Sequence, residues 1–235
     1  GFAARPLGAI IIGRLADRRG RKFALMVTIY LMAFGTVMIG LTPTYSSIGL
    51  IAPLLIVLAR LIQGFSAGGE WGGSTAFMVE WAADNRRGFV GSFQQVSVAA
   101  GLLLGSGCAA LLSTILSEDA VTSWGWRIPF LLGGVIGLVG IYMRRNVGET
   151  PVFRRNTKAD RSEIAPKQNP VGLAARAFGF TIHWTVSYYI FLAYMPTFAI
   201  RHLELDRAVA LWSNTVGLLV LMVMAPMIGF WSDRI

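Results

Sequence analysis

The stretch Gly13-Arg14-Leu15-Ala16-Asp17-Arg18-Arg19-Gly20-Arg21-Lys22 holds five cations and one carboxylate, and it lies between two long apolar segments. This pattern predicts a short charged loop that joins two membrane spans. A shortened copy, Gly229-Phe230-Trp231-Ser232-Asp233-Arg234, repeats the Gly-x-x-x-Asp-Arg spacing. Two copies in one chain predict an internal repeat, which is a common plan in transporters.

The composition is that of a membrane protein. Hydrophobic residues make up 54% of the 235 residues, charged residues make up 14%, and the mean hydropathy is +0.59. Soluble domains have about a quarter charged residues. The net charge of +9 could suggest nucleic acid as a partner, but the cations lie between apolar segments and not in a basic stripe with interleaved aromatics. We therefore expect a lipid bilayer and no nucleic acid.

Seven segments are candidates for membrane spans, which need about 20 mostly apolar residues. They are 1–13, 23–42, 50–81, 88–113, 127–143, 172–200 and 207–230. All are predicted as helices, so the expected fold class is an all-α polytopic membrane protein. The sequence starts within an apolar segment and ends within the second charged stretch, and we expect it to be a fragment of a longer protein.

Lysine and arginine are distributed unevenly among the connections. The first, third and fifth connections carry fourteen of them, whereas the connection at 43–49 carries none. The positive-inside rule then places the odd connections in the cytoplasm of a multi-pass protein of the plasma (inner) membrane.

The segment 146–171 is polar, rich in arginine and interrupted by Pro151, Pro166 and Pro170. We expect it to be a cytoplasmic linker between two bundles. Residues 1–145 would then form most of an N-terminal bundle, and residues 172–235 the start of a C-terminal bundle.

Several motifs occur together, and they carry a resemblance. They are Arg5-Pro6-Leu7-Gly8, the stretch 13–22, Arg60-Leu61-Ile62-Gln63-Gly64-Phe65-Ser66-Ala67-Gly68-Gly69-Glu70, Arg87-Gly88-Phe89, Trp124-Gly125-Trp126-Arg127-Ile128-Pro129-Phe130, Glu149-Thr150-Pro151 and Tyr194-Met195-Pro196-Thr197. By these motifs the chain resembles the major facilitator superfamily. Within it, the chain resembles the metabolite:proton symporter family, which includes alpha-ketoglutarate permease, citrate carriers and proline/betaine transporters.

The resemblance implies a fold and a function. It implies a bundle of twelve transmembrane helices, of which this chain would hold the second to the eighth, without the first helix and the last four. It also implies proton-coupled symport of a small organic acid, such as alpha-ketoglutarate, by alternating access and by a monomer. The alternatives are proton-coupled uptake of proline or betaine and, in another class, a membrane receptor that does not transport.

Polar residues within the apolar segments are candidates for substrate binding. Arg5 lies eight residues before Gly13, about 12 Å inside the span on a helix. A charge there costs at least about 2.5 kcal/mol. Arg5 therefore either binds a substrate carboxylate or pairs with a neighbouring helix. Arg60 and Gln63 share one helix face, since they lie three residues apart, and they either face the same cavity as a polar patch or form a purely structural pair.

Two residues are candidates for proton coupling. Glu70 is predicted to lie deep in its span, where it either carries a proton or forms a permanent salt bridge with Arg5 or Arg60. His183, beside Trp184, Tyr188 and Tyr189, either relays a proton or is a packed, hydrogen-bonded residue. The aromatic residues around it could also receive a quaternary ammonium group.

The remaining candidates form a predicted cytoplasmic gate. It consists of an ionic latch that closes the inner side and breaks when the bundles rock. Asp17 is also a candidate anion for the N-terminus of a helix in the other half. The gate residues are Gly13, Asp17, Arg18, Arg21, Glu80, Arg87 and Asp233.

Other chemistry finds little support in the sequence. The one cysteine, Cys108, excludes a disulfide framework and a cysteine-based metal site. We find no set of metal ligands, no Ser/His/Asp arrangement and no phosphate-binding loop. We therefore expect no cofactor, no metal and no enzymatic activity, and a small-molecule substrate and protons as the partners.

Overall fold

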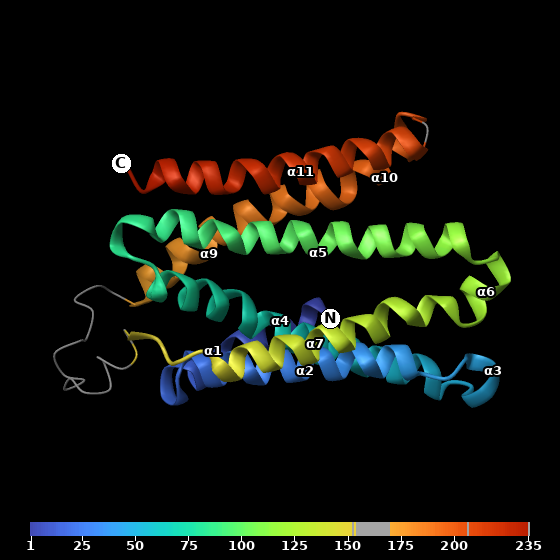
Figure 1. The fold of residues 1–235 in the computed structure, drawn as a ribbon, viewed down its shortest axis with the longest axis horizontal. Coiled ribbons are helices and arrows are strands. Elements are labelled where there is room, and N and C mark those ends of the chain that lie inside the picture. Colours follow the sequence, from blue (N-terminus) through green and yellow to red (C-terminus); the bar gives the residue numbers. More distant parts are fainter. Residues whose placement is uncertain (152, 154–169, 206, 235) are drawn as a thin grey trace.

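The computed structural model describes residues 1–151, 153, 170–205 and 207–234, and the regular structure in these residues is helical throughout (Figure 1). The long helices are α1 (Arg5–Arg19), α2 (Arg21–Leu41), α4 (Ile51–Trp81), α5 (Arg87–Ile115), α7 (Ile128–Asn146), α9 (Pro170–Tyr189), α10 (Met195–His202) and α11 (Arg207–Ser232). The short elements are the helices α3 (Tyr45–Ile48) and α6 (Glu118–Ser123), the 3-10 turns η1 (Phe2–Ala4), η2 (Asp84–Arg86) and η3 (Gly125–Arg127), and the π turn η4 (Ile190–Tyr194).

Five helical segments are long and apolar enough to cross a membrane. They are Arg21–Leu41, Ile51–Trp81, Asp84–Leu112, Gly125–Asn146 and Trp212–Ser232. Their apolar side chains face outward to a degree that a soluble protein would not tolerate: on α7, Leu132, Val135, Ile136 and Leu138 are all at least half exposed. These observations confirm a polytopic all-α membrane protein. α1 and the α9–η4–α10 segment, predicted as the first and sixth spans, are not among the five.

The stretch 13–22 is almost entirely helical, which corrects the prediction of a charged loop. α1 continues to Arg19 and α2 begins at Arg21, so Gly20 alone interrupts the helices, with φ of 104°. Leucine, alanine and arginine are strong helix formers, and glycine adopts positive φ without steric cost. The copy at 229–232 is likewise the end of α11. The repeated motif is therefore a helix terminus.

The long helices run side by side along the long axis of the molecule (Figure 1). α2 packs between α4 and α7, α1 packs on α4, and α5 packs against α11. We call one end of this arrangement the charged end. There α1, α4, α7 and α11 end and α2, α5 and α9 begin, at the left of Figure 1.

Glycines permit the close crossing of α1 and α4. A Cβ atom on Gly68 would collide with the backbone of Arg5, and one on Gly64 would collide with the backbone of Gly1. Small residues commonly permit such close helix packing in membranes. Gly101 and Gly105 on α5 show the same spacing but have open space around them.

The predicted linker, 146–171, lies largely outside the described residues. The division of the chain into two bundles stays a prediction, although the contact between α5 and α11 joins residues on both sides of that linker.

Candidate functional site

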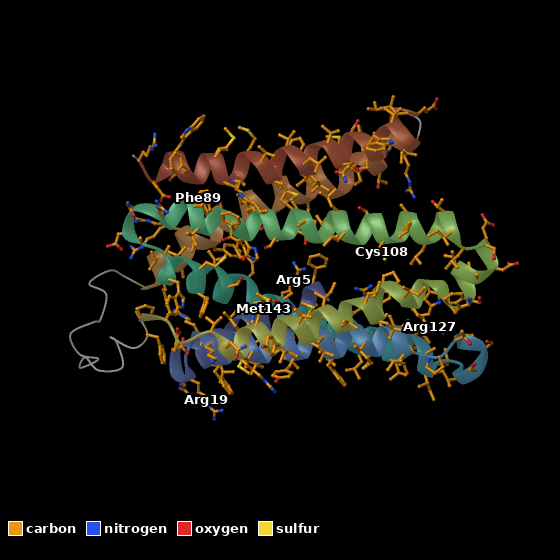
Figure 2. All side chains as sticks on the ribbon, viewed as in Figure 1. Arg5, Arg19, Phe89, Cys108, Arg127 and Met143 are labelled. Carbon is orange, nitrogen blue, oxygen red and sulfur yellow. The ribbon has the colours of Figure 1, made fainter. Side chains whose placement is uncertain are left out.

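Arg5 lies near the middle of the molecule (Figure 2), and its side chain contacts Tyr189 of α9. Its Nη1 donates a hydrogen bond of 3.4 Å to the Tyr189 hydroxyl, and its guanidinium carbon lies 4.2 Å from the centroid of the Phe2 ring. Its Nε is buried and has no hydrogen-bond partner among the described residues. This nitrogen is a donor that an anion could use.

Aromatic rings surround Arg5 and link η1, α4 and α9. Trp184 stacks on Tyr188 with 5.3 Å between the ring centroids, Trp71 lies 6.3 Å from Trp184, and Tyr189 meets Phe2 edge to face at 5.7 Å. The Tyr188 hydroxyl is buried without a described partner. We call this group the central cluster; it consists of Phe2, Arg5, Trp71, Trp184, Tyr188 and Tyr189.

His183 takes no part in the contacts of the central cluster. Its side chain is exposed on α9, whereas Trp184 and Tyr188, four residues apart, share the face that meets α4. The sequence placed all of these residues in one group, and the helical periodicity separates His183 from the others. Proton relay by His183 stays a prediction without a described partner to receive the proton.

Arg60 and Gln63 lie together but point toward α2 and α7. Arg60 donates a hydrogen bond of 3.2 Å to Gln63 Oε1, and Gln63 Nε2 donates one of 2.8 Å to the Thr36 hydroxyl on α2. The Arg60 guanidinium also lies 6.0 Å from the Phe130 ring centroid. The predicted shared helix face is observed, but these residues make no contact with Arg5.

Glu70 pairs with Arg144, and neither of its expected partners is involved. Arg144 Nη2 lies 3.0 Å from Glu70 Oε1, and Arg144 Nη1 donates to the Leu25 carbonyl oxygen of α2. Arg144 precedes the end of α7 by only two residues, so the Glu70–Arg144 pair lies on the side of the charged end, and the depth of Glu70 in the span stays a prediction. Arg144 lies just beyond the predicted span 127–143, which is why the sequence did not suggest it as the partner of Glu70.

At the charged end, three of the predicted gate residues meet. Arg21 pairs with Asp17 at 3.1 Å and with Glu80 at 3.3 Å, which ties the α1–α2 junction to the end of α4. Arg18 is exposed and stays outside this network. Arg87 pairs with Asp84, three residues before it, at 2.7 Å. It does not pair with Glu80. The network is thus smaller than predicted.

Asp233 accepts two hydrogen bonds from the first amide groups of α5. Its oxygens lie 2.6 Å from the Gly88 nitrogen and 2.8 Å from the Phe89 nitrogen. The carboxylate that follows α11 therefore binds the positive end of the dipole of α5. This is the arrangement that the sequence suggested for Asp17, realised by its copy. Around Gly13, a Cβ atom would meet nothing within 4 Å.

α5 and α11 come very close to each other beside this carboxylate. A Cβ atom on Gly88 would lie 2.7 Å from the Gly229 carbonyl oxygen, and one on Gly229 would lie 2.6 Å from that of Gly88. Only glycine permits the two backbones to come this near. Gly88, which the sequence analysis quoted only as part of a motif, is therefore a further candidate for the predicted gate.

Glu149 is a functional candidate that the sequence analysis did not single out. Both of its carboxylate oxygens accept a hydrogen bond from the backbone nitrogen of Lys22, at the start of α2, at 3.2 Å. The Lys22 side chain donates from Nζ to the Arg145 carbonyl oxygen at 2.7 Å. The start of the predicted linker is thereby attached to the α1–α2 junction. An acidic residue that follows a span and precedes a proline was the available signal.

We expect the Asp233→Ala variant to lose about 1 kcal/mol of unfolding free energy, because two helix N-terminal amides lose their acceptor. Denaturant titration of the purified full-length protein measures this loss. The matched control is Asp84→Ala, since the Asp84 side chain is 92% exposed and should contribute little. Equal stability of the two variants would contradict the assigned role of Asp233.

Comparisons with known proteins agree on one family. A model of the Major Facilitator Superfamily matches residues 2–235. The glycine betaine/proline/ectoine/pipecolic acid transporter OusA of Dickeya dadantii is 36% identical over 247 residues, which cover 99% of this chain and 49% of that protein. Alpha-ketoglutarate permease of Escherichia coli is 38% identical over 239 residues, which cover 100% of this chain and 54% of that protein.

Solved structures show the same fold. The proton:xylose symporter XylE, bound to a glucose analogue, matches with a TM-score of 0.67 at 19% identity and covers 96% of this chain and 57% of that one. The inward open conformation of XylE from E. coli matches with a TM-score of 0.66. The chain spans about half the length of the curated relatives it matches.

Proposed function

We propose, since this chain belongs to the Major Facilitator Superfamily, that it forms part of a secondary transporter that moves a small carboxylate-bearing solute together with protons by alternating access. The observation that carries this proposal is Arg5. Its guanidinium stands between α1 and α9, and its buried Nε has no described partner. A planar cation of this kind is suited to binding a carboxylate.

The position of Arg5 suits a site that is exposed to each side in turn. Its contacts come from η1 and α9, which lie on opposite sides of the predicted linker. A rocking motion of the two halves would change those contacts, and a solute bound there would bias the motion. Cytoplasmic placement of the charged end, in the inner membrane, follows in this proposal from the positive-inside rule.

A small organic acid, such as alpha-ketoglutarate, is the first candidate solute. Arg5 would bind one carboxylate. Arg60, whose guanidinium is exposed on α4 and hydrogen-bonded to Gln63, is a further cation in this region, and it would have to turn from α2 and α7 toward Arg5 to bind the second carboxylate. Two cations brought together in this way suit a dianion better than a zwitterion.

A betaine-like zwitterion is the second candidate, and the central cluster favours it. Trp71, Trp184 and Tyr188 form an aromatic group that is joined to Arg5 through Tyr189, and the uncovered faces of such rings attract a quaternary ammonium group. One carboxylate on Arg5 and one cation among the rings would fill such a site.

Competition for uptake separates the two candidates. Uptake of labelled alpha-ketoglutarate and, separately, of labelled betaine by cells or proteoliposomes with the full-length protein is measured in the presence of excess unlabelled betaine or excess unlabelled succinate. Inhibition by succinate alone supports the organic acid, and inhibition by betaine alone supports the zwitterion. No uptake of either labelled solute by a folded protein would overturn the proposed function.

A further inference from the structure

A cavity of about 310 Å³ lies at the charged end, between α2, α4, α5 and α7. We call it the inner cavity. The polar part of its lining consists of Lys22, Glu70, Ser74, Gln94, Ser97 and Arg144. Two cations and one carboxylate give the lining an excess of positive charge.

The Glu70–Arg144 pair occupies this cavity without being sealed in it. The two side chains are 29% and 27% exposed. Arg144 is held in place from its other side by the Leu25 carbonyl oxygen, so its guanidinium stays at the cavity if Glu70 turns away. A second carboxylate could then take the place of Glu70.

Gln94 supplies an oriented donor to the same cavity. Its Oε1 accepts a hydrogen bond of 3.1 Å from the Ser74 hydroxyl, which fixes the plane of the amide. Its Nε2 has no partner among the described residues, and a primary amide nitrogen can donate two hydrogen bonds. Lys22 Nζ adds a charge, and its hydrogen bond within the described part of the chain goes to the neutral carbonyl oxygen of Arg145.

Gln94 also connects the inner cavity with the central cluster. A second cavity, of about 530 Å³, lies between α4, α5 and α9, and its lining includes Trp71, Trp184 and Gln94. Gln94 thus lines both spaces. A solute that leaves Arg5 past the two tryptophans would reach Gln94 before it reached the charged end.

From these observations we infer that the inner cavity is a second binding site for a small carboxylate anion, on the path between the central cluster and the charged end. Arg144, Lys22 and Gln94 bind the anion there. Glu70 is a built-in competitor, because it occupies Arg144 when the site is empty and must be displaced when the anion arrives. The inference rests on the proposed function for the identity of the anion.

Binding of labelled succinate to the purified full-length protein tests the inference without relying on transport. The Arg5→Gln background removes the proposed central site. We expect one succinate to bind per protein in this background. Gln94→Leu should weaken this binding about tenfold, since it removes a hydrogen bond to a charged group, and Glu70→Gln should strengthen it about tenfold. Arg144 also holds α2, so variants of Arg144 are not used.

The matched control is Gln95→Leu, the same substitution at the adjacent position, which does not line the inner cavity. The dissociation constant for succinate in this variant should stay within twofold of the value in the Arg5→Gln background. Size-exclusion profiles show whether each variant is folded. Absence of binding in the Arg5→Gln background, or equal effects of Gln94→Leu and Gln95→Leu, overturns the inference.

The result also separates this inference from the proposed function. If the unmodified protein transports solute but Gln94→Leu does not weaken succinate binding, the inner site is refuted and the proposed function is not. Gln94-dependent binding in a protein that does not transport refutes the proposed function and leaves the inner site standing.

Discussion

The Arg5→Gln variant is expected to take up solute with kcat/KM lowered about 100-fold. Arg5 is the one cation described in the central cluster, and truncating one partner of a desolvated charge pair costs about 2 to 5 kcal/mol, where 1.4 kcal/mol is a factor of ten. Initial uptake rates in proteoliposomes, over a range of solute concentrations, measure the effect.

Two further variants make this result specific to the site. Arg5→Lys retains the charge but loses the planar fork, so we expect it to recover only part of the activity. Arg145→Gln is the control, because this exposed arginine contacts only the Tyr30 hydroxyl with its side chain, and uptake should stay within twofold. An Arg5→Gln variant with uptake within threefold of the unmodified protein would exclude Arg5 from solute binding.

The uptake rate of the Gly88→Val variant is expected to be at least about tenfold lower than that of the unmodified protein, while the variant still binds solute. A side chain at this position would meet the Gly229 carbonyl oxygen at 2.7 Å and Asp233 at 2.9 Å. α5 and α11 would have to separate, and the charged end could no longer close. Uptake rates, and solute binding to the purified variant, measure the two expectations.

Gly105→Val is the matched control for this prediction, because Gly105 lies on the same helix and a Cβ atom there would meet no atom of another described helix within 4 Å. Hydrogen exchange should increase at the start of α5 and the end of α11 in the Gly88 variant, and not in the control. If both variants transport equally well, the contact between Gly88 and Gly229 is not part of a gate.

Much of the fold could be predicted from the apolar segments. Hydropathy identified the spans at 23–42, 50–81, 88–113 and 127–143, and the helices α2, α4, α5 and α7 lie there. Composition alone could not show that the charged stretch is helical up to Gly20, since a run of arginines suits a loop as well as an exposed helix end. The propensities of Leu15 and Ala16 were the better guide.

The candidate site was less predictable, because pairing across helices depends on how far each helix extends. Glu70 looked like a residue deep in a span, and Arg144 looked like part of a loop. The length of α4 brings them together. Similarly, Asp233 reaches the start of α5 only because α11 crosses α5 at two glycines. A single sequence does not contain that crossing.

The central claim is that the protein couples the movement of a carboxylate-bearing solute to protons. The most direct test is accumulation of labelled alpha-ketoglutarate or betaine in proteoliposomes with the full-length protein, under an imposed pH gradient that is acid outside. The proposed function predicts accumulation above the external concentration, and its loss when a protonophore collapses the gradient. A folded protein that binds the solute but accumulates none would contradict the claim and identify a receptor that does not transport.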